Sequence, residues 1–337
     1  DLTDLGRQSE KKFCSPGFSN DGLSVATTAH TQVNAFEVTH SQARRVLWNP
    51  NRGGTAWDVA WHPYEPLLVV ATDRGFDVWS TEEARLLKQI RCKVVRTAVF
   101  VDNGEHLLTS GGGGVQKWPI KTLKNGVSAT LEFGEPELLA AGAVERMSVN
   151  TGHSIAVIDR QNAADLLSLG GAFESVQVAK VHNLDRVVLS PDGKWLFTGT
   201  WNSNGINVYD VAKRKHVKRL AAKTGSATIA VSPDGRLLVA SMKLLPQQVW
   251  KIGSWEELTT LKRPNSETWP GAIALSPSGH LLAITNDRFS ARILETDRFG
   301  DGVILPSRTQ QQSLKSLAFS PDETRLAVAF DRDVEVW

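Results

Sequence analysis

The sequence predicts an all-β fold, a β-propeller of four-stranded antiparallel blades, and three observations lead to it. An apolar residue followed by Ser-Pro-Asp-Gly, or by a weaker form of it, returns about every 40 to 48 residues. A short run that ends in a bulky residue, most often Trp, returns with the same period. No window has the period of an amphipathic helix. Units of this kind bury both faces only when neighbours stack around an axis.

Composition places the chain among globular proteins. Its 337 residues are 41% hydrophobic and 22% charged, which excludes a largely disordered chain. No apolar stretch approaches the ~18 residues of a membrane span. The 38 Lys and Arg against 36 Asp and Glu give a net charge of +2, which indicates no specific nucleic-acid partner. Cys14 and Cys92 allow at most one disulfide, and we expect a cytoplasmic protein.

The recurring turn explains how the first two strands of each unit are joined. Pro fixes φ, Asp caps the turn through its side chain, and Gly takes a left-handed position. The clear copies are LSPDG at 189–193, VSPDG at 231–235, LSPSG at 275–279 and FSPDE at 319–323. The weaker copies are FSNDG at 18–22, WHPYE at 61–65, FVDNG at 100–104 and SVNTG at 148–152.

Each unit contains four predicted strands. An unbroken apolar run precedes the turn, as in TAVF (97–100), and a second strand such as LLVAS (237–241) follows it. The fourth strand is polar and often basic, as in AKRKHVKRL (212–220). The third strand ends at Phe36, Trp79, Trp118, Leu167, Tyr209, Trp250, Leu294 or Trp337.

The spacing indicates eight repeats in a single domain, 1–337. They cover residues 11–54, 55–92, 93–139, 140–181, 182–222, 223–265, 266–308 and 309–337. Eight blades are preferred, and seven is the alternative if the weak unit near 140–180 is not a true blade. Residues 1–10 are expected to supply the outer strand of the last blade, which closes the ring and removes exposed edges. The first residue is Asp1, so we expect part of a longer chain or a tandem propeller.

These units resemble WD repeats over essentially the whole chain. The third strand that closes on Trp and the Ser-Pro-Asp-Gly turn carry the resemblance. The chain departs from the family pattern because no Gly-His pair precedes the first strand, and Ser80, Pro119 or Lys251 follows Trp in place of Asp. Better-preserved WD repeats brace each blade with a buried His–Ser–Asp–Trp hydrogen-bond network, and both departures put that network in doubt for this chain. Such loosely kept repeats are similar to those appended to bacterial signalling proteins.

Two short motifs resemble catalytic or phosphate-binding sequences. Gly152-His153-Ser154 resembles a hydrolase elbow, but a strand follows it where that elbow requires a helix. The four glycines at 111–114 are also followed by a strand, so we expect a tight loop rather than a phosphate cradle. No catalytic residue is predicted.

A metal or cofactor is not expected either. The eight histidines are scattered, with no pair at metal-ligand spacing. A propeller can also gather ligands at its axis, where its first strands begin. Those positions here are Trp57, Arg96, Asp185, Ala227, Gly271 and Lys315, a mixture that serves a cation poorly.

The basic run at 213–219 has two interpretations. It could meet an anionic partner such as nucleic acid or lipid, or it could protect an outermost strand from edge pairing. Smaller numbers of Lys and Arg residues recur in other fourth strands, which favours the interpretation that they protect the outermost strands from edge pairing.

The candidate binding residues are Trp, Arg and other polar residues expected at the wider face, where the loops meet the axial channel. Exposed Trp beside Arg is typical of interaction hot spots. They are Arg52, Trp57, Arg74, Arg96, Asp185, Trp201, Trp269, Arg288, Lys315 and Arg332. For each, packing under a loop or an ordinary solvated charge is the competing interpretation.

The sequence therefore predicts a non-catalytic scaffold that binds a protein or peptide, the interaction or sensor module of a larger bacterial signalling or regulatory protein. The alternative is an enzyme of the lactonase or hydrolase propeller kind, with a site on the axis. Carboxylates or histidines that converge there from three or more blades would favour the enzyme.

Overall fold

The structure is a computed structural model, and its strands form eight antiparallel sheets. It describes residues 17–29, 32–37, 44–47, 55–125, 128–160, 162–169, 175–181, 184–200, 205–221, 226–243, 245–262, 270–306, 313–330 and 334–337.

The strands of the first four sheets are β1 (Gly17–Phe18), β2 (Ser24–Ala29), β3 (Gln32–Glu37) and β4 (Arg44–Leu47); β5 (Ala56–Trp61), β6 (Leu67–Thr72), β7 (Gly75–Ser80) and β8 (Arg85–Arg91); β9 (Val95–Val101), β10 (His106–Gly111), β11 (Gly114–Asn125), β12 (Ser128–Phe133) and β13 (Glu137–Ala140); and β14 (Met147–Val149), β15 (Ile155–Asp159), β16 (Ala163–Ser168) and β17 (Ser175–Lys180).

Those of the other four are β18 (Leu184–Leu189), β19 (Trp195–Thr200), β20 (Ile206–Asp210) and β21 (Lys215–Leu220); β22 (Ala227–Val231), β23 (Leu237–Met242), β24 (Gln247–Lys251) and β25 (Glu257–Leu261); β26 (Ile273–Leu275), β27 (Leu281–Asp287), β28 (Ser290–Glu295) and β29 (Val303–Pro306); and β30 (Leu314–Phe319), β31 (Leu326–Phe330) and β32 (Val334–Val336).

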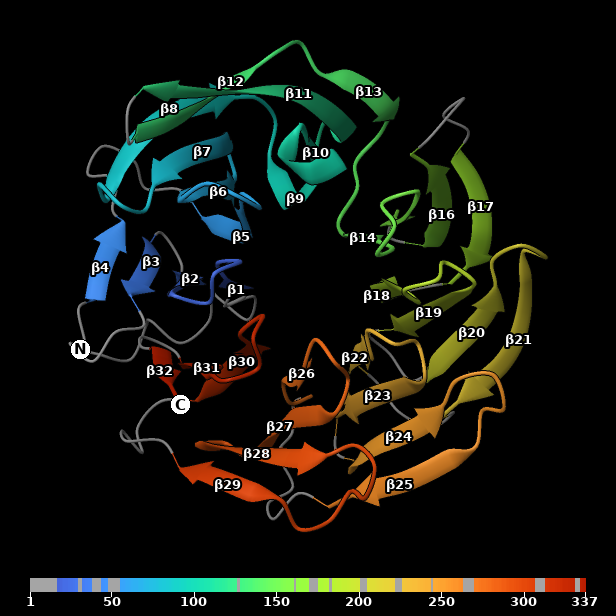
Figure 1. Ribbon diagram of the computed structural model, residues 1–337. Coiled ribbons are helices and arrows are strands. Elements are labelled where there is room, and N and C mark those ends of the chain that lie inside the picture. The colour runs from blue at the N-terminus through green and yellow to red at the C-terminus, as the bar shows by residue number, and fades with distance from the viewer. Residues whose placement is uncertain are drawn as a thin grey trace, which may run out of the picture.

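The sheets stand in a ring, with their first strands nearest the centre (Figure 1). Seven of them are blades with the four predicted strands, one of which carries a fifth, and the sheet β30–β32 has three described strands. The all-β propeller is therefore confirmed. Seven blades are complete within the described residues, the number held as the alternative, and the last repeat supplies the three-stranded sheet. The outer strand expected from residues 1–10 lies outside the described residues.

The first and last sheets are neighbours, which closes the ring. Arg325 donates from Nη1 to the carbonyl of Gly22 at 3.0 Å, across more than 300 residues of sequence. On the other side of the first sheet, the indole of Trp61 in β5 donates to the carbonyl of Gly17 in β1 at 2.8 Å. The contacts that join consecutive sheets thus also join the two ends of the described chain.

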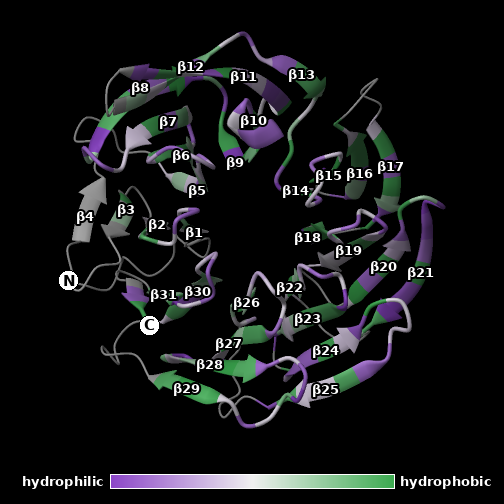
Figure 2. Cartoon of the chain, viewed as in Figure 1, coloured by the Kyte–Doolittle hydropathy of each residue, from purple (hydrophilic) through white to green (hydrophobic). Residues whose placement is uncertain are grey.

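The core lies between neighbouring sheets. Phe197 and Ile206 of the sheet β18–β21 pack on Leu238 and Trp250 of the sheet β22–β25, for example. The second strand β23 is buried at every position, because each of its faces meets a neighbouring blade. The outermost strands are exposed instead. The basic run lies on and just before β21, which is exposed at five of six positions and hydrophilic in Figure 2.

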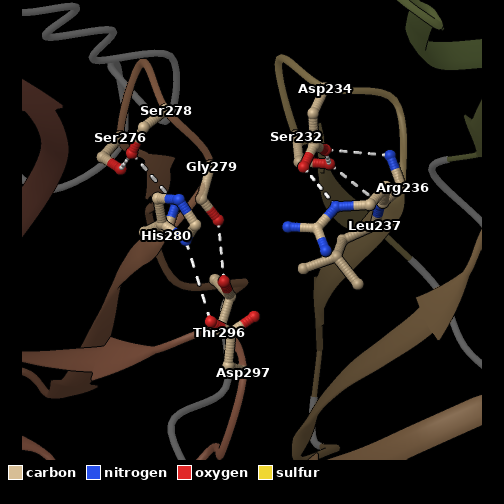
Figure 3. A network of polar contacts seen from close by, with 10 residues as sticks. All are labelled: Ser232, Asp234, Arg236, Leu237, Ser276, Ser278, Gly279, His280, Thr296 and Asp297. Atoms are coloured by element: carbon tan, nitrogen blue, oxygen red, sulfur yellow. Dashed lines mark hydrogen bonds and ion pairs between the residues drawn. The ribbon is translucent and has the colours of Figure 1, made fainter.

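The Ser-Pro-Asp-Gly turns are held by a repeated side-chain network. The Ser232 hydroxyl donates to Asp234 at 2.5 Å and accepts the Leu237 amide at 2.8 Å. The Asp234 carboxylate in turn accepts the Arg236 amide at 3.0 Å (Figure 3). Asp therefore caps the turn as predicted, and the buried Ser carries a role that the sequence analysis did not assign.

The same network recurs in other blades. Ser190 with Asp192 and Ser320 with Asp322 repeat the 2.5 Å contact. Hydrogen bonds from Ser320 and Thr324 lower the pKa of Asp322 to about 2. These carboxylates are thus fully used within their own turns.

The weak repeat at 140–181 forms a complete blade, β14–β17, but its turn is displaced by one residue from the SVNTG alignment. Asn150 takes the place of Ser and accepts the amides of Ser154 and Ile155 at 3.0 and 2.9 Å. His153, rather than Gly152, takes the left-handed position, with φ of 49°. The alignment was wrong here because an Asn side chain can replace both Ser and Asp of the motif.

The long repeat at 93–139 is explained by a hairpin. Strand β11 is 12 residues long, because it continues past the end of an ordinary third strand, and its residues from Ile120 to Asn125 pair with β12 before β13 completes the blade. Phe133 of the hairpin packs edge-on against Phe76 of the neighbouring sheet, with ring centroids 5.1 Å apart. The hairpin thus joins two blades at the outside of the ring.

All four third-strand Trp residues are expected in the core, and the expectation is wrong for Trp337, which is 37% exposed. Trp79, Trp118 and Trp250 are 3–7% exposed. Trp118 also donates from Nε1 to Thr109 Oγ1 at 2.9 Å, which joins the third strand to the second within one blade. A Trp-to-hydroxyl hydrogen bond therefore forms in this blade although Pro119, not Asp, follows the Trp.

No described helix is long and apolar enough to cross a membrane.

Candidate binding site at the channel face

The two ends of the first strands differ in character. We call the end where these strands begin the channel face, defined by residues 55–58, 95–98, 145–147, 184–186 and 313–316. The end that carries the Ser-Pro-Asp-Gly turns is the turn face. The predicted site residues on first strands all belong to the channel face.

Four of these predicted residues share one structural position. Each is the extra residue of a β-bulge at the start of a first strand: Trp57, Arg96, Asp185 and Lys315. The pairing with the second strand skips them, because Ala56 pairs with Thr72 while Asp58 pairs with Ala71. The same skip occurs in the other three strands. A bulge re-aims a side chain and interrupts the ladder.

The remaining two axial positions lack this feature. Ala227 pairs regularly with Met242, and Gly271 precedes β26 altogether. The structure therefore separates four of the six predicted axial positions from the other two. The bulges fall in β5, β9, β18 and β30, so they surround the channel from several directions (Figure 1).

Trp57 and Arg96 come together from neighbouring blades. The Arg96 guanidinium lies over the Trp57 ring, with its carbon 3.8 Å from the ring centroid. The nearest carboxylate, Glu145 of the next blade, is 3.9 Å from Arg96 Nε, which is an ion pair but too long for a hydrogen bond. No N–H of Arg96 donates a hydrogen bond to any residue that the structure describes, so the guanidinium is oriented by the stack and by the long ion pair with Glu145.

The indole N–H of Trp57 is also unused. Its Nε1 is buried and has no hydrogen-bond partner among the described residues. A buried N–H without a partner costs about 1–3 kcal/mol. This arrangement is therefore not one that stability alone favours.

Asp58 joins the two blades beside this pair. Its Oδ2 accepts the amide of Ala98 in β9 at 3.2 Å. Burial raises the pKa of Asp58 to about 7, although the Ala98 and Val59 amides and the charge of Arg146 oppose the rise. Asp58 is thus partly protonated near neutral pH.

The other predicted residues are less informative. Arg288 donates from Nε to Ser313 Oγ at 2.8 Å, so it lies beside the start of β30. Arg74 lies in the turn between β6 and β7, and its amide donates to Thr72 Oγ1 at 3.2 Å. The side chain of Asp185 and the residues Arg52, Trp201, Trp269 and Arg332 lie outside the described part of the chain.

Sequence reasoning missed Asp58, Glu145 and Arg146. A carboxylate in the middle of the apolar first strand AWDVAW was a signal that could have identified Asp58. Glu145 and Arg146 come from the repeat with the displaced turn, where the start of the first strand was not recognised.

A hollow of about 480 Å³ lies on the turn face between the sheets β5–β8 and β9–β13. In its wall, Lys124 forms an ion pair with Glu65 at 2.7 Å. His62 in its wall accepts the amides of Tyr64 and Glu65 at Nδ1 (3.3 and 3.1 Å), and burial lowers its pKa. His62 Nε2 is buried without a hydrogen-bond partner among the described residues, but none of the predicted site residues lines this hollow.

An enzyme of the lactonase or hydrolase propeller kind would bring carboxylates or histidines of several blades together. Within the described residues, no three His, Cys, Asp or Glu side chains lie close enough together to hold a metal ion. The glycines at 111–114 form the turn between β10 and β11, and Ser154 directly precedes strand β15. Neither motif has the helix that its catalytic counterpart requires.

Comparison with known families gives one match. The family model described as WD domain, G-beta repeat, matches residues 305–337. This stretch contains the sheet β30–β32, with its Ser-Pro-Asp turn and Trp337. A comparison with curated proteins gives no match.

Proposed function

Since the chain is a WD-repeat β-propeller, a fold that generally serves as a protein-interaction scaffold, we propose that it is a non-catalytic scaffold that binds a protein or peptide at its channel face. One observation carries the proposal. Four first strands place a bulged residue at the same end of the channel, and two of these residues, Trp57 and Arg96, form a stacked pair in which the Arg96 guanidinium donates to no described residue.

The mechanism is pre-organisation. The first strands are fixed by buried second strands behind them, so the bulged side chains are held before a partner arrives. Binding then costs little ordering entropy, and several blades can contact one partner at once. The partly exposed Trp57 ring supplies contact area, and the partly exposed Arg96 guanidinium supplies directional donors beside it.

The finer proposal is an interaction or sensor module of a larger bacterial signalling or regulatory protein in the cytoplasm. It is supported by the similarity of these loosely kept repeats to those of bacterial signalling proteins. The net charge of +2 also supports a protein partner over nucleic acid.

Affinity capture with the full chain tests the channel face. The bait is compared with a variant that carries Arg96→Glu and Lys315→Glu, and with a control that carries Lys215→Glu and Lys218→Glu on the outermost strand β21. Loss of the captured protein from the first variant alone supports the proposal. Retention by the first variant, or equal loss from both, contradicts it.

A further inference from the structure

We propose that the Trp57–Arg96 pair binds a side-chain carboxylate of an acidic peptide segment at the channel face. This inference rests on the proposed scaffold function and names the chemistry of the partner.

The stack fixes how the guanidinium can be used. With one face of Arg96 on the Trp57 ring at 3.8 Å, its N–H groups point outward in the plane of the guanidinium. A planar fork of donors matches a carboxylate through two parallel hydrogen bonds, and a stacked Arg is already oriented for them. None of these N–H groups has a hydrogen-bond partner among the described residues, so a ligand displaces no hydrogen bond and competes only with the 3.9 Å ion pair to Glu145.

The site is accessible but partly enclosed. The Arg96 side chain is 26% exposed, and that of Glu145 is 38% exposed. A partly desolvated guanidinium binds an anion more strongly than a fully hydrated one. The bulge at Arg96 aims the side chain toward the neighbouring blade, where Trp57 receives it.

The neighbouring charges indicate a monoanion. Glu145 adds one negative charge at 3.9 Å from Arg96, and Arg146 adds a positive charge close to Asp58. Asp58 itself carries only part of a charge near neutral pH. The surroundings are therefore weakly positive, which suits a carboxylate and disfavours the dianion of a phosphorylated side chain.

The experiment uses the full chain and labelled peptides of ten residues. One probe contains alternating Glu and Gly, a second replaces Glu by Gln, and a third replaces Glu by phosphoserine. Affinity is measured by fluorescence anisotropy at low salt. The Trp57 indole N–H resonance, assigned through Trp57→Phe, is followed by NMR as a local reporter.

We expect the Glu peptide to bind and to shift the Trp57 indole resonance, with at least about tenfold weaker binding of the Gln peptide. Arg96→Gln is expected to weaken the Glu peptide by a similar factor. Arg96→Lys is expected to weaken it as well, because Lys keeps the charge but loses the planar fork. The control Lys215→Gln with Lys218→Gln is expected to bind within twofold of wild type.

Three outcomes would overturn the inference. Loss of binding in the β21 control but not in Arg96→Gln would assign the peptide to the basic strand. Tighter binding of the phosphoserine peptide than of the Glu peptide would show that the site prefers a dianion to a carboxylate. Acetate that saturates the same resonance at equal concentration of carboxylate would assign a free small acid.

The two proposals fail separately. If the Glu peptide does not bind while Arg96→Glu with Lys315→Glu still loses the captured protein, the scaffold function stands and the carboxylate assignment falls. If Arg96→Glu with Lys315→Glu still captures the protein, both the proposed binding at the channel face and the carboxylate assignment are wrong.

Discussion

The two ends of the first strands use polar side chains in opposite ways. At the turn face, Ser232 and Asp234 satisfy each other and the backbone around them. At the channel face, Arg96 is held by a ring and a distant carboxylate, and the Trp57 indole N–H has no partner. The difference teaches how the two kinds of residue can be told apart. Polar side chains that build the fold have their hydrogen-bonding groups paired within the chain, whereas those available to a partner do not.

The largest expected effect concerns Asp58, a carboxylate of the channel face that accepts the Ala98 amide of the next blade. Its folded pKa of about 7 lies above the ordinary value of 3.8, so the folded chain holds a proton that the unfolded chain has released. The free energy of unfolding should therefore fall as pH rises from about 4 to 7. Asp58→Asn removes this contribution, and the variant should gain about 2–4 kcal/mol relative to wild type across that range.

Urea unfolding of both proteins between pH 4 and 8 measures this difference. Parallel stability profiles would show that Asp58 ionises freely in the folded chain. A gain that appears at low pH instead would contradict the sign of the shift.

The next effect tests the saturated network of the turn face. Ser232→Ala leaves the buried Leu237 amide without an acceptor, and we expect a loss of about 1–3 kcal/mol in the free energy of unfolding. The chain supplies a matched control in Asp234→Ser, because Ser278 occupies that position in LSPSG and accepts the His280 amide at 3.2 Å. The control should lose less than about 1 kcal/mol. Equal losses would mean that Ser has no separate role.

A smaller effect is expected in the blade interior. Trp118→Phe removes the donor to Thr109 Oγ1, which is buried, and should cost about 1–2 kcal/mol by chemical denaturation. Adding Thr109→Val removes the unsatisfied acceptor and should restore part of the loss. If the double variant loses more free energy of unfolding than the two single variants together, this account is contradicted.

The smallest effect should be that of Arg96→Gln on stability. A partly exposed stack contributes about 0.5–1 kcal/mol, and no described hydrogen bond is lost. Urea unfolding that changes by no more than this amount would sharpen the contrast between the faces. A loss above about 2 kcal/mol would make Arg96 a structural brace between blades and remove the basis of the comparison.

The repeat architecture was predictable because its signals are local. Pro191, Asp192 and Gly193 specify a turn through their own backbone preferences, and Trp250 lies one residue before the end of the third strand β24. The displaced turn at Asn150 was not predictable in register, because a different side chain makes the same hydrogen bonds there. The hairpin of β11 and β12 was visible only as a long interval.

The sequence by itself determined the propeller architecture, the order of the repeats and most of their turns, since each turn depends on the backbone preferences of a few consecutive residues. The tertiary structure alone decided that Trp57 and Arg96, about 40 residues apart, would stack. It also decided that Asp58 would be buried against the next blade and that bulges would select four of the six axial positions. These features arise where two blades meet, and contacts between distant segments leave no periodic trace in the chain.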